Sequence, residues 1–269
     1  MSIITNDFEK INITKIKKAK NNKKLTVITA YDALFAKLFE EIADMILVGD
    51  SLNMSFAGRP DTLSATLDQM IYHTNAVCSG AKKAFVILDM PFGTYINKDE
   101  ALKNAVKVYQ KTNAAAIKIE GGEDRADIIK HLTSNSIAVM GHIGLMPQYV
   151  RSEGGYKVRG KTKEDEEQLI ADAIAVEKAG AFAIVVEGVM SNVAKKITEA
   201  VNIPIIGIGA GNVTDGQVLV WSDMLGFFED FKPKFVRHYM QGASMVKQAV
   251  NQYRNDVQNS SFPSQEEEY

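Results

Sequence analysis

The sequence predicts a closed parallel (β/α)8 barrel, on three observations. Short apolar runs of strand-like composition alternate with longer stretches of helical period along most of the 269 residues. Strict alternation indicates parallel strands, because a parallel pair needs a crossover connection that is usually a helix. Seven or eight such units in a chain of this length favour a (β/α)8 TIM barrel over an open sheet.

The elements can be assigned in order along the chain. The run LTVITA predicts a strand at 25–30, and 33–43 predicts a helix with one apolar stripe, formed by Leu34, Leu38, Phe39 and Ile42. Further strands are expected at 45–50, 84–89, 114–120, 137–142, 182–187 and 203–208, with the eighth at 217–223. Further helices are expected at 67–81, 99–112, 124–134, 163–179, 191–201 and, as the closing helix, 235–254.

The remaining segments are two long loops and two polar ends. We expect one domain over 1–269, with a solvated lysine-rich lead-in at 1–24 and a polar, disordered tail at 255–269. The loops at 51–66 and 143–162 follow strands, so they lie on the face where the active sites of such barrels form. Loops of this length commonly carry function, and these two are placed to cover a substrate.

Composition excludes several classes of function. The formal charge of −2 and pI near 6.1 provide no basic field for nucleic acid. No apolar run reaches the roughly 18 residues that span a membrane, and no secretory signal follows the N-terminal lysines. The single cysteine, Cys78, has no disulfide partner, as expected of a protein in a reducing cytoplasm.

Five predicted strands end in an ionisable side chain. These are Asp50, Asp89, Glu120, His142 and Glu187. Parallel strands bring their C-terminal ends to one face, so residues distant in sequence converge there. Burying a carboxylate without a partner costs roughly several kcal/mol of folding free energy, so these groups must pair with each other or with a ligand. The pattern predicts a polar site at the C-terminal face.

The carboxylates suggest a metal. Asp50 and Asp89 end neighbouring strands and are hard oxygen donors of the kind that Mg²⁺ takes together with water and substrate oxygens. The alternative is that each caps the next helix. Lys118 and Glu120 share one face of their strand, opposite Ile117 and Ile119, so both charges point into the barrel. A metal with an anionic ligand would provide partners for both, and a structural ion pair is the alternative.

The last two strand ends suggest proton transfer and orientation. Glu187 is a candidate general base, since a carboxylate in apolar surroundings is an effective base near neutrality. His142 could orient a substrate or donate a hydrogen bond, and a structural role is equally open. The GIGAG segment at 207–211 ends the seventh strand, where it could approach a phosphate or form a tight turn.

The chain also resembles the ketopantoate hydroxymethyltransferase family. The resemblance covers 29–239 in order, with departures at Asn53, where glycine is usual, and at Trp221 and Ser222, where a histidine commonly precedes the aspartate. It rests on TAYDALFA (29–36), VGDSL (48–52), DMPFGTY (89–95), IKIEGG (117–122), GHIGLMPQ (141–148), GGYKVRG (154–160), VVEGV (185–189), IGIGAGNVTDGQVLV (206–220) and PKFVRHY (233–239).

The resemblance implies a barrel of the phosphoenolpyruvate/pyruvate superfamily that carries a one-carbon unit from 5,10-methylenetetrahydrofolate to 3-methyl-2-oxobutanoate. The product would be 2-dehydropantoate, made through a Mg²⁺-stabilised enolate in pantothenate biosynthesis. By motif, Asp50 and Asp89 would hold Mg²⁺ with Glu120, Ser51 and Lys118 would bind the 2-oxo acid, and Glu187 would accept the proton. The family implies a homo-oligomer, typically a homodecamer.

Two alternatives remain at this point. A Mg²⁺-dependent carbon–carbon lyase or mutase of the same superfamily would use the same enolate, although such lyases usually carry a catalytic cysteine in a loop and Cys78 is predicted to lie on a helix. A catalytically inactive barrel that serves as a scaffold is the other. Charges retained inside a barrel without use would reduce its stability, which argues against the scaffold.

Overall fold

The computed structural model describes residues 11–230 and 232–269. The chain forms two compact units, divided between Val220 and Trp221. The prediction of one domain over 1–269 stays a prediction.

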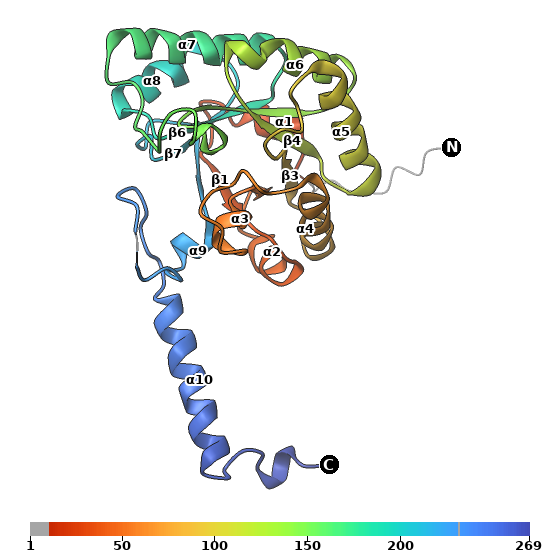
Figure 1. Ribbon diagram of the computed structural model, residues 1–269, viewed down its shortest axis with the longest axis vertical. Coiled ribbons are helices and arrows are strands. Elements are labelled where there is room, and N and C mark those ends of the chain that lie inside the picture. The colour runs from red at the N-terminus through yellow and green to blue at the C-terminus, as the bar shows by residue number, and fades with distance from the viewer. Residues whose placement is uncertain (1–10, 231) are drawn as a thin grey trace. The chain divides into compact units, whose positions relative to one another are not determined.

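The first unit contains a closed barrel of parallel strands in sequential order (Figure 1). Each strand pairs with the next along the chain, and β1 also pairs with β8. The predicted barrel is therefore confirmed. The strands are β1 Leu25–Thr29, β2 Met45–Val48, β3 Phe85–Asp89, β4 Ala116–Glu120, β5 Val139–Gly144, β6 Ala183–Glu187, β7 Ile205–Ile208 and β8 Gly216–Leu219.

Helices follow most of the strands, and several of them begin at capping side chains. Thr66 and Gln69 form a reciprocal capping box at the start of α4, while Asn97 and Thr162 cap α5 and α7. Figure 1 shows α5, α6 and α7 outside the strands. The helices of this unit are α1 Ile13–Lys18, α2 Ala33–Phe39, α3 Leu52–Ser55, α4 Leu67–Gly80, α5 Lys98–Lys111, α6 Glu123–Ser134, α7 Lys163–Lys178 and α8 Ser191–Ala200, with a short 3-10 helix, η1, at Pro147–Tyr149.

The barrel interior is apolar except at its C-terminal end. Alternate strand residues face inward, and they pack into one cluster that includes Leu25, Met45, Phe85 and Ala183. Ile16 of α1 is fully buried in the same cluster. The lead-in at 1–24 is therefore not simply solvated: its helix packs against the apolar core, while residues 1–10 lie outside the described ranges.

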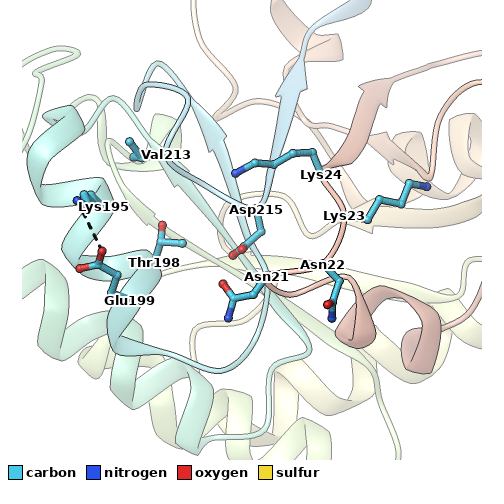
Figure 2. Close-up of a pocket in the computed structure, with 9 residues that line it drawn as sticks. All are labelled: Asn21, Asn22, Lys23, Lys24, Lys195, Thr198, Glu199, Val213 and Asp215. Atoms are coloured by element: carbon cyan, nitrogen blue, oxygen red, sulfur yellow. Dashed lines mark ion pairs between the residues drawn. The ribbon is translucent and has the colours of Figure 1, made fainter.

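A buried ion pair lies at the N-terminal ends of the strands. The Lys20 ammonium is 2.8 Å from Asp215 and donates to the Thr198 carbonyl, with side-chain exposures of 9% for Lys20 and 5% for Asp215. The neighbouring pocket, of about 410 Å³, is shown in Figure 2. It opens beside β1 and β8 at the face opposite the ionisable strand ends. Nearby lysines have partners of their own, as Lys24 donates to the Thr214 carbonyl.

We expect Lys20→Met to lower the free energy of unfolding by about 3–5 kcal/mol, because Asp215 would remain buried and charged without its partner. Urea unfolding measures this. Lys23→Met is the matched control: Lys23 also pairs with an aspartate, Asp44, at 2.6 Å, but its side chain is 66% exposed. Its loss should cost no more than about 1 kcal/mol. Equal effects at the two lysines would contradict the prediction.

Three of the four residues in the apolar stripe predicted for 33–43 are exposed, and the helix is shorter than predicted. α2 ends at Phe39, and its buried residues are Ala36 and Phe39. Leu34, Leu38 and Ile42 are each more than half exposed. An apolar period identifies a helix face, but it does not say whether that face meets the sheet of its own chain.

The second unit differs most from the predicted elements. Trp221 begins a short helix, α9 Trp221–Met224, so the eighth strand ends earlier than expected. The closing helix, α10, runs from Gly242 to Gln258 rather than over 235–254. The tail at 255–269 is not disordered throughout, since it contains the end of α10 and a 3-10 turn, η2, at Gln265–Glu267. No helix in the described ranges is long and apolar enough to cross a membrane.

Candidate active site

Strand register brings the predicted ionisable residues together. Asp89 is paired in register with Lys118, Glu120 with His142, and Gly144 with Glu187, on consecutive strands β3 to β6. Asp89 and Glu120 therefore each lie beside an ionisable partner across the ladder, whereas Glu187 lies opposite a glycine and contacts His142 instead. Asp50 follows β2 and its backbone N–H donates to the Asp89 carboxylate at 3.2 Å.

Lys118 lies at the centre of this cluster. Its ammonium is 2.8 Å from Asp89 Oδ1 and 3.8 Å from Glu120 Oε1. The expected Lys118–Glu120 pair is thus the longer contact, because the register places Asp89 beside Lys118. Burial disfavours the charged form, but the surrounding acids outweigh it and raise the pKa of Lys118.

His142 connects the cluster to Glu187. Its Nδ1 is 3.0 Å from Lys118 Nζ and 3.4 Å from Glu120 Oε1, and its Nε2 is 3.4 Å from Glu187 Oε2. Burial and Lys118 lower the pKa of His142, but Glu120 and hydrogen bonds outweigh them and raise it to about 9. That value favours a protonated ring, whereas the 3.0 Å contact favours a neutral one. We favour the neutral ring accepting from Lys118, because two cations at this separation would repel.

Two residues that the ionisable pattern missed complete the cluster. Gln148 donates its side-chain amide to Asp50 Oδ2 at 2.9 Å, and its backbone N–H donates to Glu120 Oε2 at 3.0 Å. The Tyr95 hydroxyl donates to Gln148 Oε1 at 2.5 Å. Both are neutral, so a search for charged strand ends passes over them. The available signal was their presence in the DMPFGTY and GHIGLMPQ segments.

The acids differ in how easily they ionise. Burial, reinforced by the charges of Asp89 and Glu120, raises the pKa of Asp50 well above its ordinary value. Burial also raises the pKa of Asp89, partly offset by Lys118. For Glu120, the positive charge of His142, when that ring is protonated, acts together with Lys118 to outweigh burial and lower the pKa. The site therefore concentrates negative charge that one lysine only partly balances.

Glu187 and Ser51 lie at the edge of the cluster. The Glu187 side chain is 22% exposed, more than Asp89, Lys118, Glu120 or His142. It is thus less desolvated than expected and open to a substrate from the C-terminal face. The Ser51 hydroxyl is 3.0 Å from the hydroxyl of Tyr31, which fixes its direction beside Asp50.

Glycines shape the strand ends around the site. Gly144 has φ +99°, and a Cβ there would lie 2.3 Å from the Glu187 carbonyl oxygen, so only glycine allows β5 to pass this close to β6. At Gly211 in the 207–211 segment, φ is +80° and a Cβ would lie 2.3 Å from Ser191 Oγ. Close packing of a turn accounts for that glycine.

The two long loops contact each other across this face. Arg151 is 3.0 Å from Asp61, and the Tyr156 hydroxyl is 3.7 Å from Met54 Sδ. Asn53 is 2% exposed and its amide donates to the Asp61 carbonyl and to Ser64 Oγ. The unusual residue at position 53 therefore holds the first loop in shape.

The acid cluster fits a hard divalent cation. Asp89 Oδ1 and Glu120 Oε1 are buried, and the Lys118 ammonium lies 2.8 Å from the first and 3.8 Å from the second. No three His, Cys, Asp or Glu side chains among residues 11–230 and 232–269 stand close enough to hold a metal ion. Asp50 and Asp89 nevertheless provide the one or two carboxylates that Mg²⁺ typically takes together with water and substrate oxygens.

Solved structures with the same architecture are distant in sequence. A phosphonopyruvate hydrolase in complex with oxalate and Mg²⁺ has a TM-score of 0.63 at 14% identity, covering 95% of this chain and 92% of that one. A 2,3-dimethylmalate lyase, described as a PEP mutase/isocitrate lyase superfamily member, has a TM-score of 0.58 at 14% identity, covering 95% and 90%. At this identity the likeness shows the barrel fold alone.

Sequence relatives are much nearer. A 3-methyl-2-oxobutanoate hydroxymethyltransferase from Aliarcobacter butzleri (strain RM4018) is 87% identical over 269 residues, covering all of both chains. One of the same name from Helicobacter pylori (strain ATCC 700392 / 26695) is 52% identical, again over all of both. The sequence model of ketopantoate hydroxymethyltransferase matches residues 10–265. The chain belongs to the ketopantoate hydroxymethyltransferase family.

Proposed function

We propose that the protein is a 3-methyl-2-oxobutanoate hydroxymethyltransferase of pantothenate biosynthesis. It transfers the one-carbon unit of 5,10-methylenetetrahydrofolate to 3-methyl-2-oxobutanoate, with water supplying the hydroxyl oxygen, and yields 2-dehydropantoate and tetrahydrofolate. The observation that carries this proposal is the buried cluster of Asp50, Asp89, Lys118 and Glu120 at the C-terminal ends of β2 to β4, with Glu187 at its edge. This cluster supplies both a cationic side chain, Lys118, that can bind an anion, and a base, Glu187.

The chain's own residues divide the work. Lys118 binds the carboxylate of the 2-oxo acid, assisted by the Ser51 hydroxyl, and His142 orients the substrate. Glu187 removes the proton at C3 and holds it while the new carbon–carbon bond forms at that carbon. The lower, apolar part of the barrel keeps water out from below.

Asp50 and Asp89 would hold Mg²⁺, and Glu120 would complete or support its shell from the same cluster. When bound, Mg²⁺ would polarise the 2-oxo group and favour enolate formation. The donor set of hard oxygens and the surplus of buried negative charge support this assignment. 5,10-Methylenetetrahydrofolate is the co-substrate of the proposed reaction.

A Mg²⁺-dependent lyase or mutase of the same superfamily is less well supported. Solved structures that bear such names share the fold only, at 12–15% identity. Cys78, the one cysteine of the chain, lies within α4 and not in a loop at the strand ends.

The decisive experiment incubates the protein with 3-methyl-2-oxobutanoate, 5,10-methylenetetrahydrofolate and Mg²⁺ and looks for 2-dehydropantoate by mass spectrometry. Formation of the product, dependent on all three additions, supports the proposal. Cleavage of a supplied 2-oxo acid without folate, and no 2-dehydropantoate, would favour the lyase.

Replacing Asp89 by Asn should weaken Mn²⁺ or Mg²⁺ binding by at least about 100-fold. Removing a residue that only hydrogen-bonds to a metal ligand already lowers metal affinity roughly 10–100-fold, and Asp89 is proposed as a direct ligand. Titration by electron paramagnetic resonance with Mn²⁺ measures the affinity. Asp44→Asn is the control, because Asp44 is a paired carboxylate at the opposite end of the barrel. Wild-type affinity in Asp89→Asn would rule out the ligand assignment.

We further propose a cytoplasmic homodecamer. The exposed apolar residues Leu34, Leu38 and Ile42 on and beside α2 support association with other copies, since large apolar side chains gathered on a surface are typical of contact sites. Analytical ultracentrifugation tests the number of subunits.

A further inference from the structure

Gln148 has more contacts with the acid cluster than its neutral side chain would suggest. It lies in η1 of the long loop after β5 and is 4% exposed. Its Nε2 donates to Asp50 Oδ2 at 2.9 Å and to the Met90 carbonyl at 3.0 Å, and its Oε1 accepts from the Tyr95 hydroxyl. Its backbone N–H donates to Glu120 Oε2.

The direction of the Gln148 amide is fixed by these partners. Its NH₂ group faces two acceptors, and its oxygen faces a hydroxyl donor, so the flipped amide would oppose oxygen to oxygen. Tyr95 is itself anchored, because its oxygen accepts from the Glu120 backbone N–H at 3.4 Å. A buried amide held at both ends is a rigid support for the carboxylate to which it donates.

Through this arrangement one residue holds two of the three acids. The side chain of Gln148 fixes one oxygen of Asp50, and its backbone fixes one oxygen of Glu120. The other Glu120 oxygen has no hydrogen-bond donor among the described residues. The donors thus orient each carboxylate without occupying all of it.

We propose that Gln148, held by Tyr95, is a positioning residue that sets the orientation of Asp50 and Glu120 for the divalent cation. The consequence for catalysis rests on the proposed function, whereas the effect on metal binding can be measured independently of it. Neither residue touches the reacting atoms in this account. Residues that hydrogen-bond to the ligands of a metal, and so orient them, commonly affect the affinity for the metal in this way.

The test measures Mn²⁺ affinity by electron paramagnetic resonance, without substrate, in Gln148→Met, Tyr95→Phe and the double variant. Gln148→Met keeps the volume and removes the hydrogen bonds of the side chain. It should weaken Mn²⁺ binding roughly 10-fold or more, the range for residues that orient ligands. Tyr95→Phe should weaken it less. If Tyr95 acts through Gln148, the double variant should lose no more than Gln148→Met alone.

Tyr109→Phe is the matched control. Its hydroxyl likewise makes two hydrogen bonds, donating to the Ala115 carbonyl and accepting from the Ala138 N–H, but it does not touch the acids. It should leave Mn²⁺ affinity unchanged. The melting temperature of each variant is measured as well. If Gln148 had only a structural role, its substitution would lower the melting temperature and leave the Mn²⁺ affinity of the folded protein as in the wild type.

Mn²⁺ affinity within twofold of wild type in Gln148→Met would overturn the proposal, as would strictly additive effects of the two substitutions. Failure of the wild type to make 2-dehydropantoate while Gln148→Met still loses Mn²⁺ affinity would reject the proposed function alone. The two proposals therefore fail by different observations.

Discussion

Glu187→Gln should abolish exchange of the C3 proton of 3-methyl-2-oxobutanoate with D₂O while leaving Mn²⁺ affinity close to that of the wild type. Glutamine keeps the size of the side chain but cannot take the proton. A positioned base typically contributes about 10²–10⁴-fold, so turnover should fall by roughly that factor. Proton nuclear magnetic resonance follows the exchange, and a metal titration checks that the acid cluster is intact.

Glu153→Gln is the control for this substitution. Glu153 lies in the loop after β5, and its side chain is 27% exposed against 22% for Glu187. It contacts Arg159 at 3.5 Å rather than the cluster. Exchange at the wild-type rate in Glu187→Gln would exclude Glu187 as the base. Loss of exchange in both variants would indicate a general effect of charge at this face.

The barrel could be predicted because its signals are local and repeated. A buried parallel strand such as Phe85–Asp89 must be apolar on both faces, and the helix after it must carry an apolar stripe, so the alternation is visible in the sequence. β8 was placed with less accuracy because Gly216–Leu219 is short and merges with the start of α9.

Periodicity does not identify what covers a face. The residues Leu34, Leu38 and Ile42 follow a helical period, yet they are exposed and the sheet is covered by Ala36 and Phe39. In the opposite sense, Ile16 and Lys20 belong to a segment so rich in lysine that it resembled a solvated lead-in. The exposure of the first set and the burial of the second both depend on tertiary packing, which a local sequence pattern does not determine.

The sequence identified the ionisable residues that the structure brings together, but not how they pair. Asp50, Asp89, Lys118, Glu120 and His142 are conspicuous because an ionisable group in an apolar strand needs a partner. Their pairing was not predictable along the strand, since it depends on the register between β3, β4 and β5. The neutral residues Gln148 and Tyr95 carry no charge signal, and apart from their place in the DMPFGTY and GHIGLMPQ segments their contacts at the acids are visible only in the three-dimensional structure.

Removing Lys118 should have the largest effect on stability of any change at the site. Lys118→Met leaves Asp50, Asp89 and Glu120 buried without their cation, and breaking such a pairing costs about 3–5 kcal/mol. Binding of the 2-oxo acid should be lost as well. Urea unfolding and a fluorescence titration with 3-methyl-2-oxobutanoate measure the two effects.

The penalty should depend on pH in a defined direction. Burial already raises the pKa values of Asp50 and Asp89 above those of the unfolded chain, and loss of Lys118 raises them further. The folded variant therefore binds more protons than the unfolded one, so its stability falls as the pH rises above the unfolded value. The deficit relative to wild type should be larger at pH 8 than at pH 5.

Two further variants test the electrostatic cause of this penalty. Lys98→Met removes a lysine from an exposed pair with Asp127 and should cost no more than about 1 kcal/mol at either pH. Adding Asp89→Asn to Lys118→Met removes one of the uncompensated charges and should restore part of the lost stability, most clearly at pH 8. If the double variant is instead less stable than Lys118→Met at pH 8, packing and not charge dominates at this position, and the acids tolerate burial without the lysine.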